Sequence, residues 1–262
     1  MSDINGLEGL FARLDDLCAA AERGELVLSS FLSPRELHYA KGYLDRRGAH
    51  YLVFGGYAEA ERTRIHFLPD YMEGVSDARE LAEYGYGSTV AALEIKGSGY
   101  RRLTHRDYLG SLLGLGVERD VVGDVLVFGE SGERAVVFCD GGIKEFFLGH
   151  LEKIANDKVK VADLDLERIE LPQRSFAAIN DTVASARFDC IVAALCSLSR
   201  ERAKEVITAG LAELDYEAEE RPDRTVNAPC TVSVRGQGKF RVLSVTDKTR
   251  KGRYRLVAEK FL

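Results

Sequence analysis

The sequence has no long apolar run. No stretch approaches the roughly 20 apolar residues that a membrane-spanning helix requires, so we expect no membrane partner. The first residues, Met1 to Glu8, lack a basic region followed by an apolar one. We therefore also expect no signal peptide and a cytoplasmic location.

Cysteine pairs and metal-binding patterns are also missing. The five cysteines (18, 139, 190, 196 and 230) form no Cys-x-x-Cys pair, and three of them lie in apolar runs. Buried free thiols in a reducing compartment are the favoured interpretation. No His/Cys/Asp/Glu cluster has metal-ligand spacing, so no metal is expected. Gly97-Ser-Gly99, followed by Tyr-Arg-Arg, ends a predicted strand several residues before the next helix, which argues against a nucleotide fingerprint and a small-molecule cofactor.

One stretch resembles a catalytic motif but lacks its other parts. His105-Arg-Asp107 is similar to a kinase catalytic loop, yet Leu112 stands where that loop has asparagine, and no Asp-Phe-Gly follows. Asp107 lies three residues after Thr104, which indicates a helix cap instead. We predict no catalytic residues and a protein that is not an enzyme.

Charge is divided unevenly along the chain. Residues 1–173 hold 20 basic and 30 acidic residues, a net charge of −10, whereas residues 174–262 hold 16 and 12, a net charge of +4. A basic end on an acidic chain is typical of polyanion binding. The alternative is a solvated surface that binds nothing.

Periodicity predicts an α+β protein with three parts: residues 1–75, 88–166 and 175–262. The first is an α/β region, with helices over 6–23 and 34–47 and strands over 51–54 and 63–68. Between those strands, Gly55-Gly-Tyr-Ala-Glu-Ala-Glu-Arg62 is open to two interpretations. It either places Arg62 and Arg64 beside a nucleic acid or forms a tight structural turn.

The middle part reads β-α-β-β-α-β, the order of a ferredoxin/RRM-like sandwich. Its strands are predicted near 91–96, 125–128, 134–139 and 159–164, with helices beginning at Thr104 and spanning 143–154. Some domains of this fold stack RNA bases on the open face of the sheet. The third strand, Arg134–Cys139, lacks the glycine and aromatic pattern for that stacking. We expect this face to serve packing or protein contact.

The last part predicts two short helices followed by strands. Ser185 and Ser199 are expected to cap the helices, and Phe188, Ile191, Val192 and Leu195 form a buried stripe. Ala212, Leu214 and Tyr216 then alternate with acidic residues as one strand, and a hairpin turns around 247–252. Basic residues lie at the two helix starts, beside Gly236-Gln-Gly238 and in the hairpin. The predicted RNA-binding residues are Arg187, Ser199, Arg200, Arg202, Lys204, Arg235, Lys239, Arg241, Lys251, Arg253 and Arg255.

Four motifs in this part resemble the S4 (αL-type) RNA-binding domain: Ser185-x-Arg-Phe-Asp189, Ser199-Arg-x-x-Ala203, Ile207-x-x-Gly210 and Arg235-Gly-x-Gly-Lys-Phe240. The resemblance implies a helix pair and strand lip that dock on structured RNA through phosphates and shape. Two positions depart from that pattern. Asp215 stands in place of the usual asparagine, and Ala228-Pro229 stands in place of Gly-Asp, which puts affinity in question.

Upstream motifs resemble the YlmH family, whose members end in an S4 domain. They are Phe31-Leu-Ser-Pro-Arg-Glu36, Gly55-Gly-Tyr-x-x-Ala-Glu-Arg62, His105-Arg-Asp-x-Leu-Gly110, Leu115-Gly-Val-x-Arg119 and Gly123-Asp124. The resemblance implies a protein that binds rRNA and tRNA on the large ribosomal subunit, in ribosome-associated quality control. We expect it to be a monomer. Two alternatives stay open: an RNA-modifying enzyme (pseudouridine synthase or methyltransferase) that uses the S4 domain for delivery, and a division-linked protein scaffold.

Overall fold

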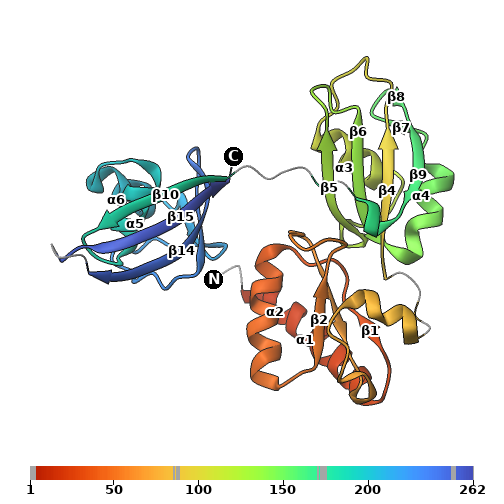
Figure 1. Ribbon diagram of the computed structural model, residues 1–262, viewed down its shortest axis with the longest axis horizontal. Coiled ribbons are helices and arrows are strands. Elements are labelled where there is room, and N and C mark those ends of the chain that lie inside the picture. Colours follow the sequence, from red (N-terminus) through yellow and green to blue (C-terminus); the bar gives the residue numbers. More distant parts are fainter. Residues whose placement is uncertain are drawn as a thin grey trace. The chain divides into compact units, whose positions relative to one another are not determined.

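The computed structural model describes residues 4–84, 86, 89–169, 171, 176–248 and 252–261 (Figure 1). The chain divides into two compact units, Met1–Pro172 and Gln173–Leu262. Both mix helices with antiparallel sheets, so the predicted α+β class is confirmed. Within the described ranges no helix is long and apolar enough to cross a membrane.

The first unit begins with two helices packed on a small antiparallel sheet of order β1-β3-β2. These elements are α1 (Ile4–Glu22), β1 (Val27–Leu28), α2 (Pro34–Arg47), β2 (Tyr51–Phe54) and β3 (Arg64–Phe67). The predicted start of α2 is confirmed as a capping box, in which the Ser33 hydroxyl accepts from the Glu36 amide and the Ser33 amide donates to the Glu36 carboxylate at 2.8 Å. Two short 3₁₀ helices follow, η1 (Asp70–Met72) and η2 (Ala78–Tyr84).

A four-stranded antiparallel sheet of order β5-β6-β4-β9 follows in the same unit (Figure 1). Its elements are β4 (Val90–Lys96), α3 (His105–Leu113), η3 (Arg119–Val121), β5 (Val122–Phe128), β6 (Arg134–Asp140), η4 (Gly141–Ile143), α4 (Lys144–His150), β7 (Lys153–Ile154), β8 (Asp157–Lys158), β9 (Lys160–Leu164) and η5 (Leu166–Arg168). The predicted order β-α-β-β-α-β is present, with the β7–β8 hairpin inserted before the last strand. Thr104 and Asp107 form the predicted capping box at the start of α3.

The two faces of this sheet bury different partners. On one face, Tyr108 of α3 and Phe147 of α4 join a core with Leu93 and Val137. On the other face, Phe138 lies in a core with Phe31, which comes from the segment before α2. Both phenylalanines are almost completely buried. The centre of this second face is therefore closed by the chain's own N-terminal region, which supports the predicted packing role.

A glycine turn makes the closure possible. Gly56 has a φ of +100°, and a Cβ placed there would lie 2.2 Å from the Phe138 ring. Only glycine allows the backbone to come this close. The Tyr57 ring then packs 4.9 Å from the Phe138 ring, centroid to centroid. Gly55–Arg62 is thus the segment that joins the N-terminal region to the sheet.

Polar contacts fix the same junction. The Asp124 carboxylate accepts hydrogen bonds from the Tyr57 hydroxyl and the Glu61 amide, both at 2.7 Å, and from the Arg62 amide at 3.0 Å. The Arg62 guanidinium donates to the Phe31 carbonyl at 2.8 Å. Arg64 is 8% exposed and pairs with Asp140 at 2.8 Å. Placement of Arg62 and Arg64 beside a nucleic acid is therefore wrong, because internal carbonyls and carboxylates hold both side chains.

The second unit places two helices against a six-stranded antiparallel sheet of order β10-β15-β14-β13-β11-β12 (Figure 1). Its elements are β10 (Phe176–Val183), α5 (Phe188–Cys196), α6 (Arg200–Thr208), β11 (Ala212–Leu214), β12 (Glu217–Ala218), β13 (Cys230–Val234), β14 (Gly238–Lys248) and β15 (Tyr254–Phe261). The predicted stripe of α5 is buried against Val232, Phe240 and Leu256 of the sheet. Alternate residues of these strands face away from the helices.

Three local predictions in this unit are corrected. Tyr216 does not continue β11, because Asp215 and Tyr216 both have positive φ (49° and 70°) and form a two-residue turn into β12. Ser185 does not cap α5, because the helix is capped at Arg187 and the Ser185 hydroxyl lies 3.4 Å from the Cys190 sulfur. Phe176–Val183, for which no strand is predicted, forms β10 and pairs along its length with β15.

All five cysteines are free, as predicted, and four of them are buried. Burial raises the pKa of the Cys139 and Cys230 thiols to about 12 and that of Cys196 to about 11. These groups stay neutral at physiological pH and act as small apolar side chains.

His66 of β3 is a buried titratable group in the first unit. It is 0% exposed, and its Nε2 lies 2.8 Å from the Thr89 hydroxyl, while Nδ1 has no hydrogen-bond partner among the described residues. Burial, reinforced by repulsion from Arg64, lowers the pKa of His66 to about 4. In the unfolded chain His66 binds a proton near pH 6.5, whereas in the folded protein it does so only near pH 4. The contribution of neutral His66 to the free energy of unfolding is therefore fully present above pH 6.5 and is lost as the pH falls toward 4.

We predict that His66→Gln removes this pH dependence. Between pH 7 and pH 5 the wild-type protein should lose about 2 kcal/mol more unfolding free energy than the variant. Urea unfolding followed by circular dichroism at both pH values measures the difference. Equal losses in the two proteins would contradict the assignment.

Candidate nucleic-acid interface

The start of α5 carries a buried carboxylate between two arginines. Asp189 is 0% exposed, and its two oxygens accept hydrogen bonds from Arg187 Nε at 3.2 Å and Arg200 Nε at 3.0 Å. The arginine side chains are 41% and 51% exposed. Arg187 precedes α5 and Arg200 opens α6, so a single buried group ties both helix starts together.

The charge on Asp189 is maintained by its partners. Burial alone would raise its pKa, but the hydrogen bonds from Arg187 and Arg200 outweigh this and leave the pKa below its ordinary value. The same contact raises the pKa of Arg200. The site therefore has one fixed negative charge on the inside and two oriented guanidinium groups that reach solvent.

The next helix adds a cap and two further cations. The Ser199 hydroxyl accepts from the Arg202 amide at 3.2 Å, which confirms the predicted cap of α6. Ser199 thus acts on the helix itself. The Arg202 guanidinium pairs with Glu205 at 2.6 Å, and Lys204 is exposed on the helix surface.

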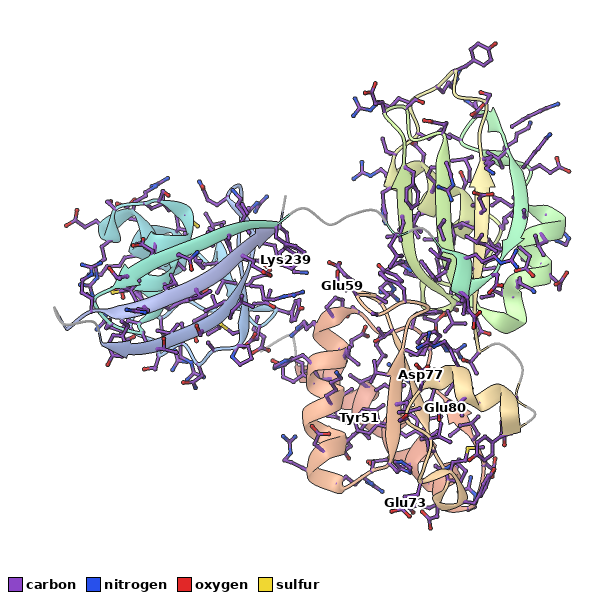
Figure 2. All side chains as sticks on the ribbon, in the orientation of Figure 1. Tyr51, Glu59, Glu73, Asp77, Glu80 and Lys239 are labelled. Carbon is purple, nitrogen blue, oxygen red and sulfur yellow. The ribbon has the colours of Figure 1, made fainter. Side chains whose placement is uncertain are left out.

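Other predicted residues lie on the opposite side of the sheet. Lys239 and Arg241 alternate with the buried Phe240 and Val242 on β14, so they face away from α5 and α6. Figure 2 shows Lys239 at the end of the sheet where β14 begins and β15 ends. The predicted set is therefore divided between two faces: the helix starts and the outer face of the sheet.

Aromatic rings accompany the cations of the outer face. The Lys239 ammonium lies 5.4 Å from the Tyr216 ring centroid and 5.3 Å from that of Phe261. The Arg241 guanidinium lies 5.7 Å from Phe176 and 5.5 Å from Phe261. These distances fit cation–π contacts. The three rings were not among the predicted residues, because their spacing in the sequence gives no sign that the sheet brings them together.

The remaining predicted residues are spread around this face. Arg235 is exposed and donates its amide to the Leu211 carbonyl, next to Gly236, which has a φ of +78°. Arg255 is exposed on the outer face of β15, and Arg253 donates to the hydroxyl of Thr182 at 2.9 Å. Lys251 lies outside the described residues.

The two departures from the S4 pattern have structural explanations. Asp215 accepts from the Thr231 amide at 2.9 Å and donates its own amide to the Thr231 carbonyl. Its carboxylate therefore stabilises the turn before β12. Pro229 immediately precedes β13, where it removes no amide from the ladder.

Among the residues that the structure describes, no group of three His, Cys, Asp or Glu side chains is placed to hold a metal ion.

Two family models match consecutive parts of the first unit. Residues 10–72 match the family described as "YlmH, N-terminal", and residues 88–168 match "Putative RNA-binding domain in YlmH". The ribosome-associated protein quality control protein P2 of Bacillus subtilis (strain 168) is 26% identical over 241 residues, which cover 91% of this chain and 89% of that protein. The structure of the cell division protein YlmH from Streptococcus pneumoniae is 22% identical, with a TM-score of 0.46. The match covers 64% of this chain and 92% of the Streptococcus chain.

The two family matches lie on consecutive parts of the chain and together cover more than half of it, and the similarity to the Bacillus protein continues through nearly the whole length. The chain belongs to the YlmH family.

Proposed function

We propose that this chain is a non-enzymatic RNA-binding protein that docks on structured ribosomal RNA or tRNA of the large subunit. The family description names an RNA-binding domain, and the Bacillus relative is named for ribosome-associated quality control, which supports the same process here. The observation that carries the proposal is the pair of arginines that Asp189 holds at two helix starts.

This arrangement suits phosphate. Each arginine uses Nε for Asp189, so the exposed terminal nitrogens remain accessible to an outside acceptor. A planar guanidinium donates two parallel hydrogen bonds to phosphate oxygens. Because the buried carboxylate already orients both side chains, binding costs little additional side-chain entropy.

We also propose how the chain divides into domains. Residues 175–262 form an S4-type domain, residues 88–166 a ferredoxin/RRM-like domain and residues 1–75 the N-terminal region. The helix pair α5–α6, followed by the strands β11 to β15 in the last unit, and the β5-β6-β4-β9 order of the middle sheet support these assignments. The protein acts as a monomer in the cytoplasm, in keeping with its five free thiols.

We predict that Arg200→Glu weakens binding to purified large ribosomal subunits at least tenfold, because it removes a phosphate contact and introduces repulsion. Lys239→Glu tests the outer face of the sheet by itself. The matched control is Arg13→Glu, the same charge change at an exposed position of α1. Co-sedimentation measures all three. If Arg200→Glu binds like the control, the helix starts are not the docking surface.

Salt dependence gives a second prediction. The logarithm of the association constant should fall linearly with the logarithm of salt concentration, because phosphate contacts release counterions. Arg200→Glu should reduce that slope by about 0.7 to 0.9, the effect of one lost contact. Fluorescence anisotropy with labelled tRNA over a salt series measures the slope, and an unchanged slope would contradict a phosphate contact at Arg200.

Asp189→Asn tests the buried carboxylate. The substitution leaves two arginines without their charged acceptor, and we expect a loss of about 2 kcal/mol of unfolding free energy in the second unit. RNA affinity should also fall, although no cation is removed, because Arg187 and Arg200 lose their fixed orientation. Urea unfolding and anisotropy measure the two effects. A variant with full stability would show that the carboxylate does not organise the helix starts.

A further inference from the structure

The loop between β4 and α3 is the most basic surface segment of an otherwise acidic unit. From Lys96 to Arg106 the chain carries Lys96, Arg101, Arg102 and Arg106 and no acidic residue, while residues 1–173 as a whole have a net charge of −10. The three arginines are all exposed. The proposed docking surface of the second unit does not involve this loop.

Hydrogen bonds hold the base of the loop, and the side chains at its tip do not take part in them. The Ser98 amide and hydroxyl donate to the Asp157 carboxylate at 2.9 and 2.6 Å. The Gly97 amide donates to the Glu133 carbonyl and the Leu103 amide to the Ser131 carbonyl, both at 2.7 Å. These bonds fix both ends of the loop against the strands beside it.

Tyr100 projects from the tip. It is 95% exposed, the highest value among the large exposed hydrophobic residues of the described chain. Its amide donates to the Ser98 hydroxyl at 3.3 Å, so its backbone is tied to the fixed base while the ring remains in solvent. Gly99, with a φ of +77°, turns the chain immediately before it. The ring therefore contributes nothing to the core.

Neighbouring strands extend the positive surface. Lys160 of β9 lies opposite Lys96 of β4, and Lys158 of β8 is exposed close by in the sequence. Lys96 itself pairs with Glu94 at 2.7 Å. Lys158 and Lys160 thus add positive charge beside the loop, and Asp157 is already engaged by Ser98.

A lone ring among cations fits RNA better than protein. The core of a protein–protein interface is apolar and depleted of charge. Exposed rings flanked by arginine and lysine are the arrangement by which proteins stack unpaired bases and track the phosphate backbone. The alternative RNA surface of this domain, the centre of its sheet, is closed by Phe31 and Tyr57.

We propose that the loop Gly97–Thr104 is a second RNA contact, in which Tyr100 stacks on an unpaired base and Arg101 and Arg102 bind the adjoining phosphates. This inference rests on the proposed RNA-binding function, and it names the residues that would make the contact within residues 88–168, which match the putative RNA-binding domain in YlmH.

The test compares full-length variants by fluorescence anisotropy with labelled unfractionated tRNA, which has unpaired loops, and with a fully paired RNA duplex. Tyr100→Ala should weaken tRNA binding about tenfold and leave duplex binding unchanged, with an unaltered salt slope, because stacking releases no counterion. Tyr100→Phe should restore wild-type affinity. Arg101→Glu/Arg102→Glu should weaken binding to both probes and lower the slope by about 1.4 to 1.8.

The matched control is Arg13→Glu/Arg46→Glu, which makes the same charge change at exposed positions of α1 and α2. If both loop variants bind like this control while Arg200→Glu binds weakly, the loop inference is wrong and the proposed function stands. If the wild-type protein binds neither tRNA nor large subunits, the proposed function itself fails. The wild-type protein could instead bind a protein partner in a complex that resists nuclease treatment. If the loop variants lose that partner and keep their RNA affinity, the loop is a protein contact and the inference is overturned.

Discussion

The second unit depends on one carboxylate that has been removed from water. Asp189 is completely buried, and the cost of burying its charge is offset by two guanidinium groups from different helix starts. Its own amide also bonds the Pro222 carbonyl, so the strand-connecting segment before β13 is tied to the same point. The starts of α5 and α6 and the segment before β13 therefore meet at a single buried charge, while the apolar faces of the helices pack on the sheet.

In the first unit, the four-stranded sheet has α3 and α4 on one face and apolar side chains on the other face, and these side chains must also be covered. The N-terminal region covers that face with Phe31 and Tyr57, and Gly56 gives the close approach that the Phe138 ring requires. Asp124 adds directional hydrogen bonds at the edge of the contact. The part of this sheet face around Phe138 is consequently closed.

The sequence predicts those features that depend on neighbours within a few residues. The start of α2 at Pro34, the helix cap at Thr104 and the buried stripe of α5 follow from spacing alone, and the structure confirms them. Features that depend on distant partners were not predictable in this way. β10 is a strand because β15 lies beside it, and the rings around Lys239 and Arg241 come from three separate segments. The alternation of apolar and acidic residues predicts that β11 continues through Tyr216, but the chain makes a tight turn at Asp215 and Tyr216 instead.

The anchoring of the β4–α3 loop has a consequence for how such a protein can diverge. Ser98, Gly97 and Leu103 hold the loop through hydrogen bonds to Asp157 and to two main-chain carbonyls. The side chains at the tip are therefore not needed to hold the loop in place. Substitutions of the exposed Tyr100, Arg101 and Arg102 are expected to leave the free energy of unfolding almost unchanged. The loop tip is therefore a position at which residues can be exchanged while the scaffold beneath it keeps its hydrogen bonds.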